Sequence, residues 1–339
     1  MEQSNKPQEA EKIEAKEKVE ATAKIQSDKM EENTTTTPDV APNRVAPHKK
    51  MIGATTFPAW YDYLALLAMF FVAQLIIGWV AAHCGLSGDV VSELVSGDAD
   101  SLAGDVARRT AARATAIGYL VGMSLMVFMT LIYRQMRGSH GNLIKLSIKG
   151  LEPVRLLTLM VVVLAASVVI EPIVNLLPGE VDYNFLGRGG WALLSTVIFA
   201  PLFEEVIFRG VILGSVRSRS GVIAAWLISS LCFGLAHGVP SQIVATFVIG
   251  LILGYAYLRS GSLLTSMALH AMNNALAMLM IMLGMEQTSL SEMVGTGAYL
   301  AIYSVSLIIF IIWIWQAVSR IRRMRLAERT IFAEQEEEE

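Results

Sequence analysis

Eight apolar runs of roughly membrane-spanning length constrain this chain more than any other feature. A helix needs about 20 apolar residues to cross a bilayer, and most of the runs are close to that length. Hydrophobic residues make up 54% of the 339 residues, and the charges gather at the two ends and in the gaps between runs. We therefore predict an all-α, polytopic membrane helical bundle with about eight transmembrane helices. The runs cover residues 61–82, 116–133, 156–177, 191–216, 222–235, 243–258, 263–283 and 298–318.

The charges between the runs predict the orientation of the bundle. Basic residues occupy alternate gaps and follow the last run, whereas the intervening gaps carry acidic residues such as Glu180 and Glu286. Because cytoplasmic loops are enriched in lysine and arginine, we expect both termini in the cytoplasm. The gap after the first run departs from this pattern, and we expect an interfacial helix over residues 102–113 there. The basic residues used are Arg134, Arg137, Lys145, Lys149, Arg155, Arg217, Arg219, Arg259, Arg320, Arg322, Arg323 and Arg325.

Composition divides the chain into three parts. Residues 1–50 are polar, and we expect a disordered cytoplasmic tail. Residues 51–320 form the expected membrane domain, and residues 321–339 form a charged cytoplasmic tail. Two cysteines are too few for a disulfide framework, and the N-terminus lacks the apolar segment of a secretory signal. We expect a multi-pass protein of a bacterial inner membrane, with the lipid bilayer as a partner and no nucleic acid.

Three charged residues lie inside the fourth apolar run: Glu204, Glu205 and Arg209. Each ionised residue near the centre of a membrane helix costs about 2.5–3.5 kcal/mol on insertion scales. Glu205 and Arg209 are four residues apart and can pair on one helix face. Glu204 is rotated from that face by about 100°, so it is free to face a cavity. The trio fits equally well a structural ion pair and a carboxylate prepared to act as a general base.

Two further pairs have the same four-residue spacing: Phe233 with His237, and His270 with Asn274. A single histidine at a helix end is often an interfacial anchor, and histidine and asparagine can cross-link helices. Together with Glu204 these residues can also hydrolyse an amide. In that arrangement Glu204 and His237 activate water, and His270 and Asn274 stabilise the oxyanion. Alternatively Glu204, His237 and His270 could hold zinc with an open position for water.

The depths of these residues along their runs do not match. Counting places Glu204 near mid-membrane and His270 toward the cytoplasmic half, but His237 toward the outer end of its run. We therefore expect the fifth helix to be tilted or displaced. A partly re-entrant turn at residues 238–242 would have a similar effect.

The ordered set of Glu204–Glu205–x₃–Arg209, Phe233–x₃–His237 and His270–x₃–Asn274 resembles the CPBP family. This family contains the CAAX proteases and bacteriocin-processing membrane proteins, is also called Abi, and includes the type II CAAX prenyl endopeptidases. Each pattern alone is weak, but the three in order on successive apolar runs are specific. The resemblance covers about residues 190–280.

The resemblance implies an eight-helix, glutamate-type intramembrane endopeptidase. Glu204 would be the general base with His237, and His270 and Asn274 would form the oxyanion hole. Supporting roles fall to Glu205, Arg209 and Phe233. No cofactor is expected, although zinc at Glu204, His237 and His270 is a secondary possibility. The expected partner is a membrane-associated peptide or protein, and nothing in the sequence identifies a groove for a prenyl group.

Two other functions compete with the protease. A membrane scaffold or bacteriocin-immunity protein would use the same polar residues as helix cross-links. A transporter with Glu204 and His270 as a proton relay would need internal repeats or interrupted helices in matching positions, and the sequence has neither.

Overall fold

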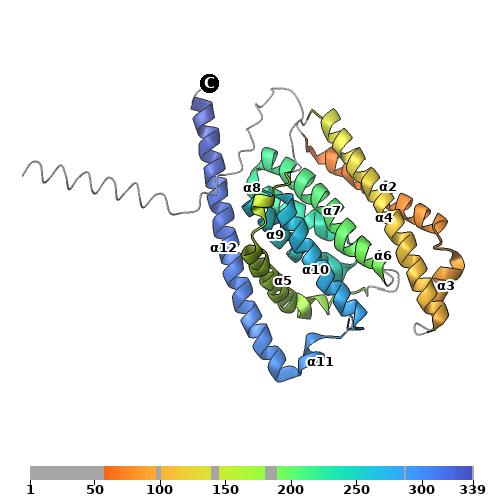
Figure 1. Cartoon of the computed structure of the whole chain (residues 1–339). Coiled ribbons are helices and arrows are strands. Elements are labelled where there is room, and N and C mark those ends of the chain that lie inside the picture. The colour runs from red at the N-terminus through yellow and green to blue at the C-terminus, as the bar shows by residue number, and fades with distance from the viewer. Residues whose placement is uncertain (1–56, 97–100, 139–144, 180–188, 286–287, 338–339) are drawn as a thin grey trace, which may run out of the picture. The chain divides into compact units, whose positions relative to one another are not determined.

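In this computed structural model, the described residues are 57–96, 101–138, 145–179, 189–285 and 288–337. The regular structure of these ranges is entirely helical, which confirms the predicted all-α class (Figure 1). The tail at 1–50 and the acidic gap at Glu180 lie outside the described residues.

Six described helices are long and apolar enough to cross a membrane, and the protein is an integral, multi-pass membrane protein. Their apolar faces remain largely exposed, as expected for side chains that contact lipid acyl chains. The number eight and the cytoplasmic termini stay predictions. The six helices are α2 (Trp60–His83), α4 (Leu102–Met136), α5 (Pro153–Val174), α9 (Pro240–Ser260), α10 (Leu263–Met282) and α12 (Thr296–Glu337).

Local sequence explains several helix boundaries. Ser101 caps α4, where its Oγ accepts a hydrogen bond from the backbone N–H of Gly104 at 2.9 Å. The separate interfacial helix expected at 102–113 was wrong, because α4 continues without a break from Leu102 through that stretch. A short helix, α3 (Gly88–Ser96), precedes it. Pro240 is the first residue of α9, the position where a missing N–H costs nothing, so α9 starts earlier than predicted.

The fourth apolar run is one helical rod with two widened π turns. It comprises α6 (Gly190–Leu193), η3 (Leu194–Phe199), α7 (Ala200–Glu205) and η4 (Val206–Leu213), of which η3 and η4 are π-helical. Pro201 lacks a backbone N–H and crowds the carbonyl four residues earlier, and η3 lies directly before it. π turns occur often at functional sites. Their position on both sides of Glu204 and Glu205 therefore indicates that this helical rod contains a functional site.

The fifth apolar run lies in α8 (Gly214–Leu235), which is broken at Gly221. Gly221 has φ 80° and ψ 172°, a conformation that suits glycine because it has no Cβ. Glu328 of α12 stabilises the helix that resumes after the break. Its Oε2 accepts from the N–H of Val222 at 3.1 Å, and its Oε1 accepts from Nε of Arg217 at 2.7 Å.

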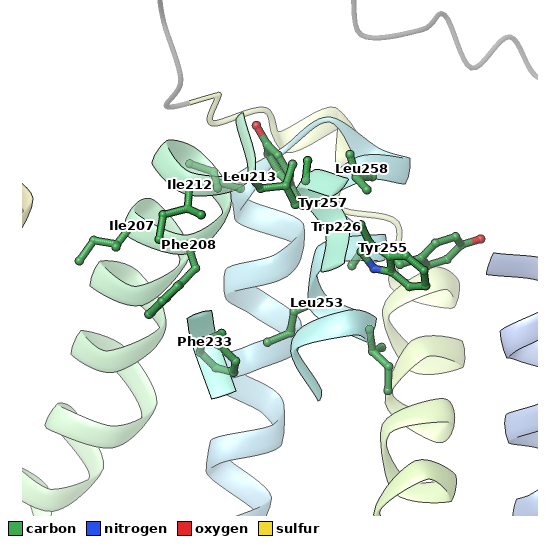
Figure 2. Close-up of a cluster of buried hydrophobic side chains, with 14 of the residues drawn as sticks. Ile207, Phe208, Ile212, Leu213, Trp226, Phe233, Leu253, Tyr255, Tyr257 and Leu258 are labelled. Carbon is green, nitrogen blue, oxygen red and sulfur yellow. The ribbon is translucent and has the colours of Figure 1, made fainter. Parts of the chain in front are cut away.

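The principal core lies between η4, α8 and α9, where large side chains interdigitate (Figure 2). Phe208 and Phe233 meet edge to face with ring centroids 5.2 Å apart. The indole of Trp226 donates to the carbonyl of Leu251 at 2.8 Å, so its polar atom is satisfied inside the core. This core holds α8 against the rod that carries the charged residues.

Glycines allow α2 and α4 to pack closely. A Cβ on Gly118 would lie 2.5 Å from the carbonyl oxygen of Ile77, so only glycine permits this approach. The same two helices are joined at one end by Asp62, which is fully buried. Asp62 Oδ1 accepts from the hydroxyl of Tyr133 at 2.7 Å and from Nε of Arg137 at 2.9 Å. Close packing and this ion pair fix α4 relative to α2.

Glu171 joins α5 to the short helix α11 (Leu290–Val294). Its Oε1 accepts from the backbone N–H of Leu290 at 2.9 Å. Ser289 and Glu292 form a capping box at the start of α11. The hydrogen bond from the backbone N–H of Ser289 lowers the pKa of Glu292 below its usual value.

Near its C-terminus, α12 remains helical through residue 337, beyond the end of its apolar part. The expected boundary at residue 320 therefore does not coincide with a helix end.

Replacing Glu328 with alanine should destabilise the protein by about 1–2 kcal/mol, because it removes a helix cap and a partly buried ion pair. Thermal unfolding of the purified protein in a neutral detergent measures the change. Arg329→Ala is the matched control, since Arg329 is exposed on the same helix. Equal melting temperatures for the two variants would contradict the capping role.

Candidate active site

The centre of the candidate site is the ion pair between Glu205 of α7 and Arg209 of η4. Arg209 Nη1 lies 2.8 Å from Glu205 Oε1, and both side chains have no exposed surface. Arg209 Nη2 also donates to the carbonyl oxygen of Gly250 in α9 at 3.1 Å. The predicted pairing is present, and one guanidinium joins the rod to a second helix.

The ring of Phe233 in α8 lies among three of the polar side chains. The guanidinium carbon of Arg209 is 4.5 Å from the ring centroid, a cation–π contact. The rings of His237 and His270 meet Phe233 edge to face, at centroid distances of 5.0 Å and 5.5 Å. Both histidines are therefore brought to one aromatic ring. Gly250 packs against it too, since a Cβ there would lie 3.2 Å from Phe233 Cδ1.

Glu204 points away from the ion pair and toward α4. Its Oε1 accepts a hydrogen bond from the hydroxyl of Tyr119 at 2.8 Å. Its Oε2 lies 3.9 Å from Nε2 of His270, and the Glu204 side chain retains 16% exposure. Only Glu205 forms the ion pair with Arg209, both carboxylates lie beside the ring of His270, and Glu204 is the more accessible of the two.

His270 of α10 contacts Glu205 through Nδ1, which lies 3.0 Å from Oε1. An ionised carboxylate only accepts hydrogen bonds, so Nδ1 carries a proton in this arrangement. The neutral ring then presents a lone pair at Nε2, and Nε2 can donate only when the ring carries both protons. The protonation of His270 thus decides whether it can stabilise an oxyanion.

Asn274 joins α10 to the π-helical segment η3 by a hydrogen bond. Its Nδ2 donates to the carbonyl oxygen of Thr196 at 2.9 Å, and its Oδ1 accepts from Nδ2 of Asn273 at 3.3 Å. Asn273 thereby orients the neighbouring amide. One of the two N–H groups of Asn274 is used in this cross-link, and the second remains for another acceptor.

His237 lies just after the end of α8, in the turn before Pro240. Its Nδ1 lies 2.9 Å from the carbonyl oxygen of Phe233. That contact favours the tautomer with a proton on Nδ1, which leaves a lone pair on Nε2. A neutral ring of this form can accept a hydrogen bond or a proton. The predicted tilt of this helix relative to a bilayer stays a prediction.

The zinc alternative does not fit this geometry. No three histidine, cysteine, aspartate or glutamate side chains of the described ranges gather closely enough to hold a metal ion. Glu204, His237 and His270 share one neighbourhood, but they do not form a ligand set.

Two members of the site were missed from the sequence, Tyr119 and Gly250. A tyrosine in an apolar run resembles a lipid-facing residue, and Gly250 contributes only a carbonyl group and the absence of a side chain. The spacing Gly250–x₃–Gly254 indicates close helix packing and could have drawn attention to α9. Nothing in the sequence near Tyr119 points to Glu204, which lies 85 residues away.

The fold and this cluster define a class: a multi-pass helical membrane protein with a buried carboxylate, arginine and histidine site. Residues 188–276 match the family model described as "Type II CAAX prenyl endopeptidase Rce1-like". This match supports the CAAX-protease, or CPBP, family that the three motifs indicated.

Two curated proteins are each similar to about a quarter of this chain. An "Uncharacterized 24.3 kDa protein" of Escherichia coli is 40% identical over 93 residues, which is 26% of this chain and 42% of that protein. The "Putative membrane peptidase YdiL" of Bacillus subtilis (strain 168) is 27% identical over 88 residues, 26% of this chain and 36% of that protein. The matches thus span less than half of each relative. No solved structure matches the chain significantly.

Removing either member of the buried ion pair should lower the free energy of unfolding. Arg209→Met leaves the carboxylate of Glu205 without its cation, and we expect destabilisation of about 3–5 kcal/mol. The double variant Glu205→Gln with Arg209→Met should lose less stability than Arg209→Met alone, because no buried charge is left unpaired. Thermal unfolding in detergent tests this order, and a double variant less stable than Arg209→Met would contradict it.

Proposed function

We propose that the protein is an intramembrane glutamate-type endopeptidase that hydrolyses a peptide bond of a membrane-associated substrate. The observation that carries the proposal is the position of Glu204. It is the more exposed carboxylate of a buried pair, within 4 Å of a histidine and oriented by a tyrosine. Such groups, held in low dielectric and partly accessible, suit proton transfer.

Water activation falls to Glu204 and His237 in this mechanism. Glu204 takes a proton from a water molecule that His237 Nε2 helps to orient, and the water oxygen attacks the substrate carbonyl carbon. The resulting tetrahedral intermediate collapses when the C–N bond breaks. The proton held by Glu204 passes to the leaving amine, which restores the carboxylate.

His270 and Asn274 stabilise the oxyanion. His270 donates from Nε2 when its ring carries both protons, and Glu205 orients the ring by accepting from Nδ1. Asn274 contributes the N–H that the contact with Thr196 leaves available. Glu205 and Arg209 fix the position of His270 relative to α7 and η4, and Phe233 lines the site.

The proposed substrate is a peptide or protein held at the membrane, because the site lies among membrane-spanning helices. The matched family model is described as a prenyl endopeptidase, which makes a prenylated C-terminal tail one class to test. The described relatives come from bacteria, which agrees with a proposed location in a bacterial inner membrane.

A scaffold or bacteriocin-immunity protein is the second candidate. The hydrogen bond from Asn274 to Thr196 and the pair of Glu205 with Arg209 support it, because both connect neighbouring helical segments whatever the chemistry. The two candidates differ at Glu204, whose partly exposed carboxylate is needed for hydrolysis but contributes less to packing.

Glu204→Gln should abolish cleavage while the protein still folds and inserts, because the amide cannot accept the proton from water. Purified wild type and variant are incubated with farnesylated and unmodified C-terminal peptides, and mass spectrometry detects the products. Glu292→Gln, which alters an exposed carboxylate in α11, is the matched control. Cleavage by a folded Glu204→Gln protein at the wild-type rate would refute the role of Glu204.

Tyr119→Phe should lower kcat by about 10–100-fold with little change in KM, because a hydrogen bond to a charged group is worth about 1.5–3 kcal/mol. The tyrosine acts through Glu204 and serves as a positioning residue. Steady-state kinetics on any peptide that the wild type cleaves supplies the measurement, with Tyr299→Phe in α12 as the control. An unchanged kcat would remove Tyr119 from the mechanism.

A further inference from the structure

A second cluster of charge lies away from the candidate active site, where α5 begins, α9 ends and the apolar part of α12 ends. Arg155 is in the first turn of α5, Arg259 is in the last turn of α9, and Arg320 follows the apolar part of α12. Arg320 interacts electrostatically with both of the others and with Arg323. Like charges repel each other, and an anion bound among them would offset that repulsion.

Aromatic contacts hold this cluster together. Tyr255 of α9 meets Trp313 of α12 edge to face, with ring centroids 5.9 Å apart. The hydroxyl of Tyr255 accepts a long hydrogen bond from Nη1 of Arg259 at 3.5 Å. Arg320 lies two helical turns after Trp313, on the same face of α12. These contacts join α9 to α12 on the side where Arg259 and Arg320 lie.

The guanidinium groups lack sufficient partners of their own. The Nε atoms of Arg155, Arg259 and Arg320 are buried, and each has no hydrogen-bond partner in the described part of the chain. Glu152, which bonds Arg155 at 2.8 Å, is the nearby carboxylate, and it is more than half exposed. One carboxylate does not balance three guanidinium groups. Buried N–H donors that carry charge are costly when unpaired, so the cluster is suited to a bound anion.

The depth of the cluster identifies the class of anion. All three arginines lie where an apolar helix segment begins or ends, which is the level of the lipid headgroups. Guanidinium groups match the oxygens of a phosphate in geometry and charge, and basic pockets between membrane helices bind anionic headgroups. We propose that Arg155, Arg259 and Arg320 form a site for a phosphate group, supplied by an anionic phospholipid headgroup at the membrane surface.

The full chain, purified and delipidated in a neutral detergent, is titrated with dioleoylphosphatidylglycerol and with dioleoylphosphatidylcholine, and native mass spectrometry records bound lipid. We expect preferential retention of phosphatidylglycerol. Arg320→Gln should weaken its binding about tenfold or more, because it removes charge-assisted hydrogen bonds. Arg325→Gln is the matched control on the exposed face of α12 and should bind as the wild type does.

Stability provides a second readout that distinguishes binding from misfolding. Without anionic lipid, Arg320→Gln should melt at or above the wild-type temperature, because the substitution relieves repulsion. With phosphatidylglycerol, the wild type should gain more stability than the variant. Equal phosphatidylglycerol binding by the Arg320 and Arg325 variants, or equal binding of the two lipids by the wild type, would overturn the proposal. Displacement by millimolar inorganic phosphate would overturn the lipid as the source and assign the site to soluble phosphate.

Discussion

The buried pair of Glu205 and Arg209 is the interaction on which the rest of the site depends. Two opposite charges with no exposed surface attract strongly in a low dielectric, and separating them would leave each without solvation. The same guanidinium bonds the carbonyl of Gly250 and stacks on Phe233, while the same carboxylate contacts His270. One ion pair therefore fixes the relative positions of η4, α8, α9 and α10. Within this set of contacts, the one from Glu205 Oε1 to Nδ1 orients His270.

Close packing by small residues brings these polar groups within reach of each other. At Gly250 and at Gly118, a side chain would occupy the space that a neighbouring helix already fills. Between apolar helices in lipid, burial of hydrophobic surface supplies little attraction, so close contacts and hydrogen bonds contribute most. Gly118 precedes Tyr119, and the tight packing of α4 against α2 constrains the helix that delivers the Tyr119 hydroxyl to Glu204. Positioning of the candidate general base thus depends on the glycines of a helix pair outside the matched domain.

Charged residues in this protein fall into two groups with different consequences. Those in the middle of the bundle are paired almost completely and have geometry suited to proton transfer. Those at the helix ends bind other segments, as Glu328 does with Val222 and Asp62 with Arg137, or gather as unbalanced arginines. In our proposal, the first group performs hydrolysis and must be reached by water. The second group joins helices of the bundle to one another and, in our proposal, binds the headgroups of the surrounding lipid.

The sequence by itself determined the helical class and the position of the apolar segments, because a span needs a run of about 20 apolar residues. It also determined the four-residue pairs, because they depend on the fixed periodicity of a helix. It therefore predicted the bond from Arg209 to Glu205 and the separate direction of Glu204. Only the tertiary structure decided that Tyr119 binds Glu204, that His270 contacts Glu205 and that Asn274 bonds Thr196. The π turns on both sides of the charged residues also escaped the sequence, because they alter the periodicity on which such reasoning relies. Contacts between distant segments arise from which helices pack together and how closely, and no local pattern of residues encodes that choice.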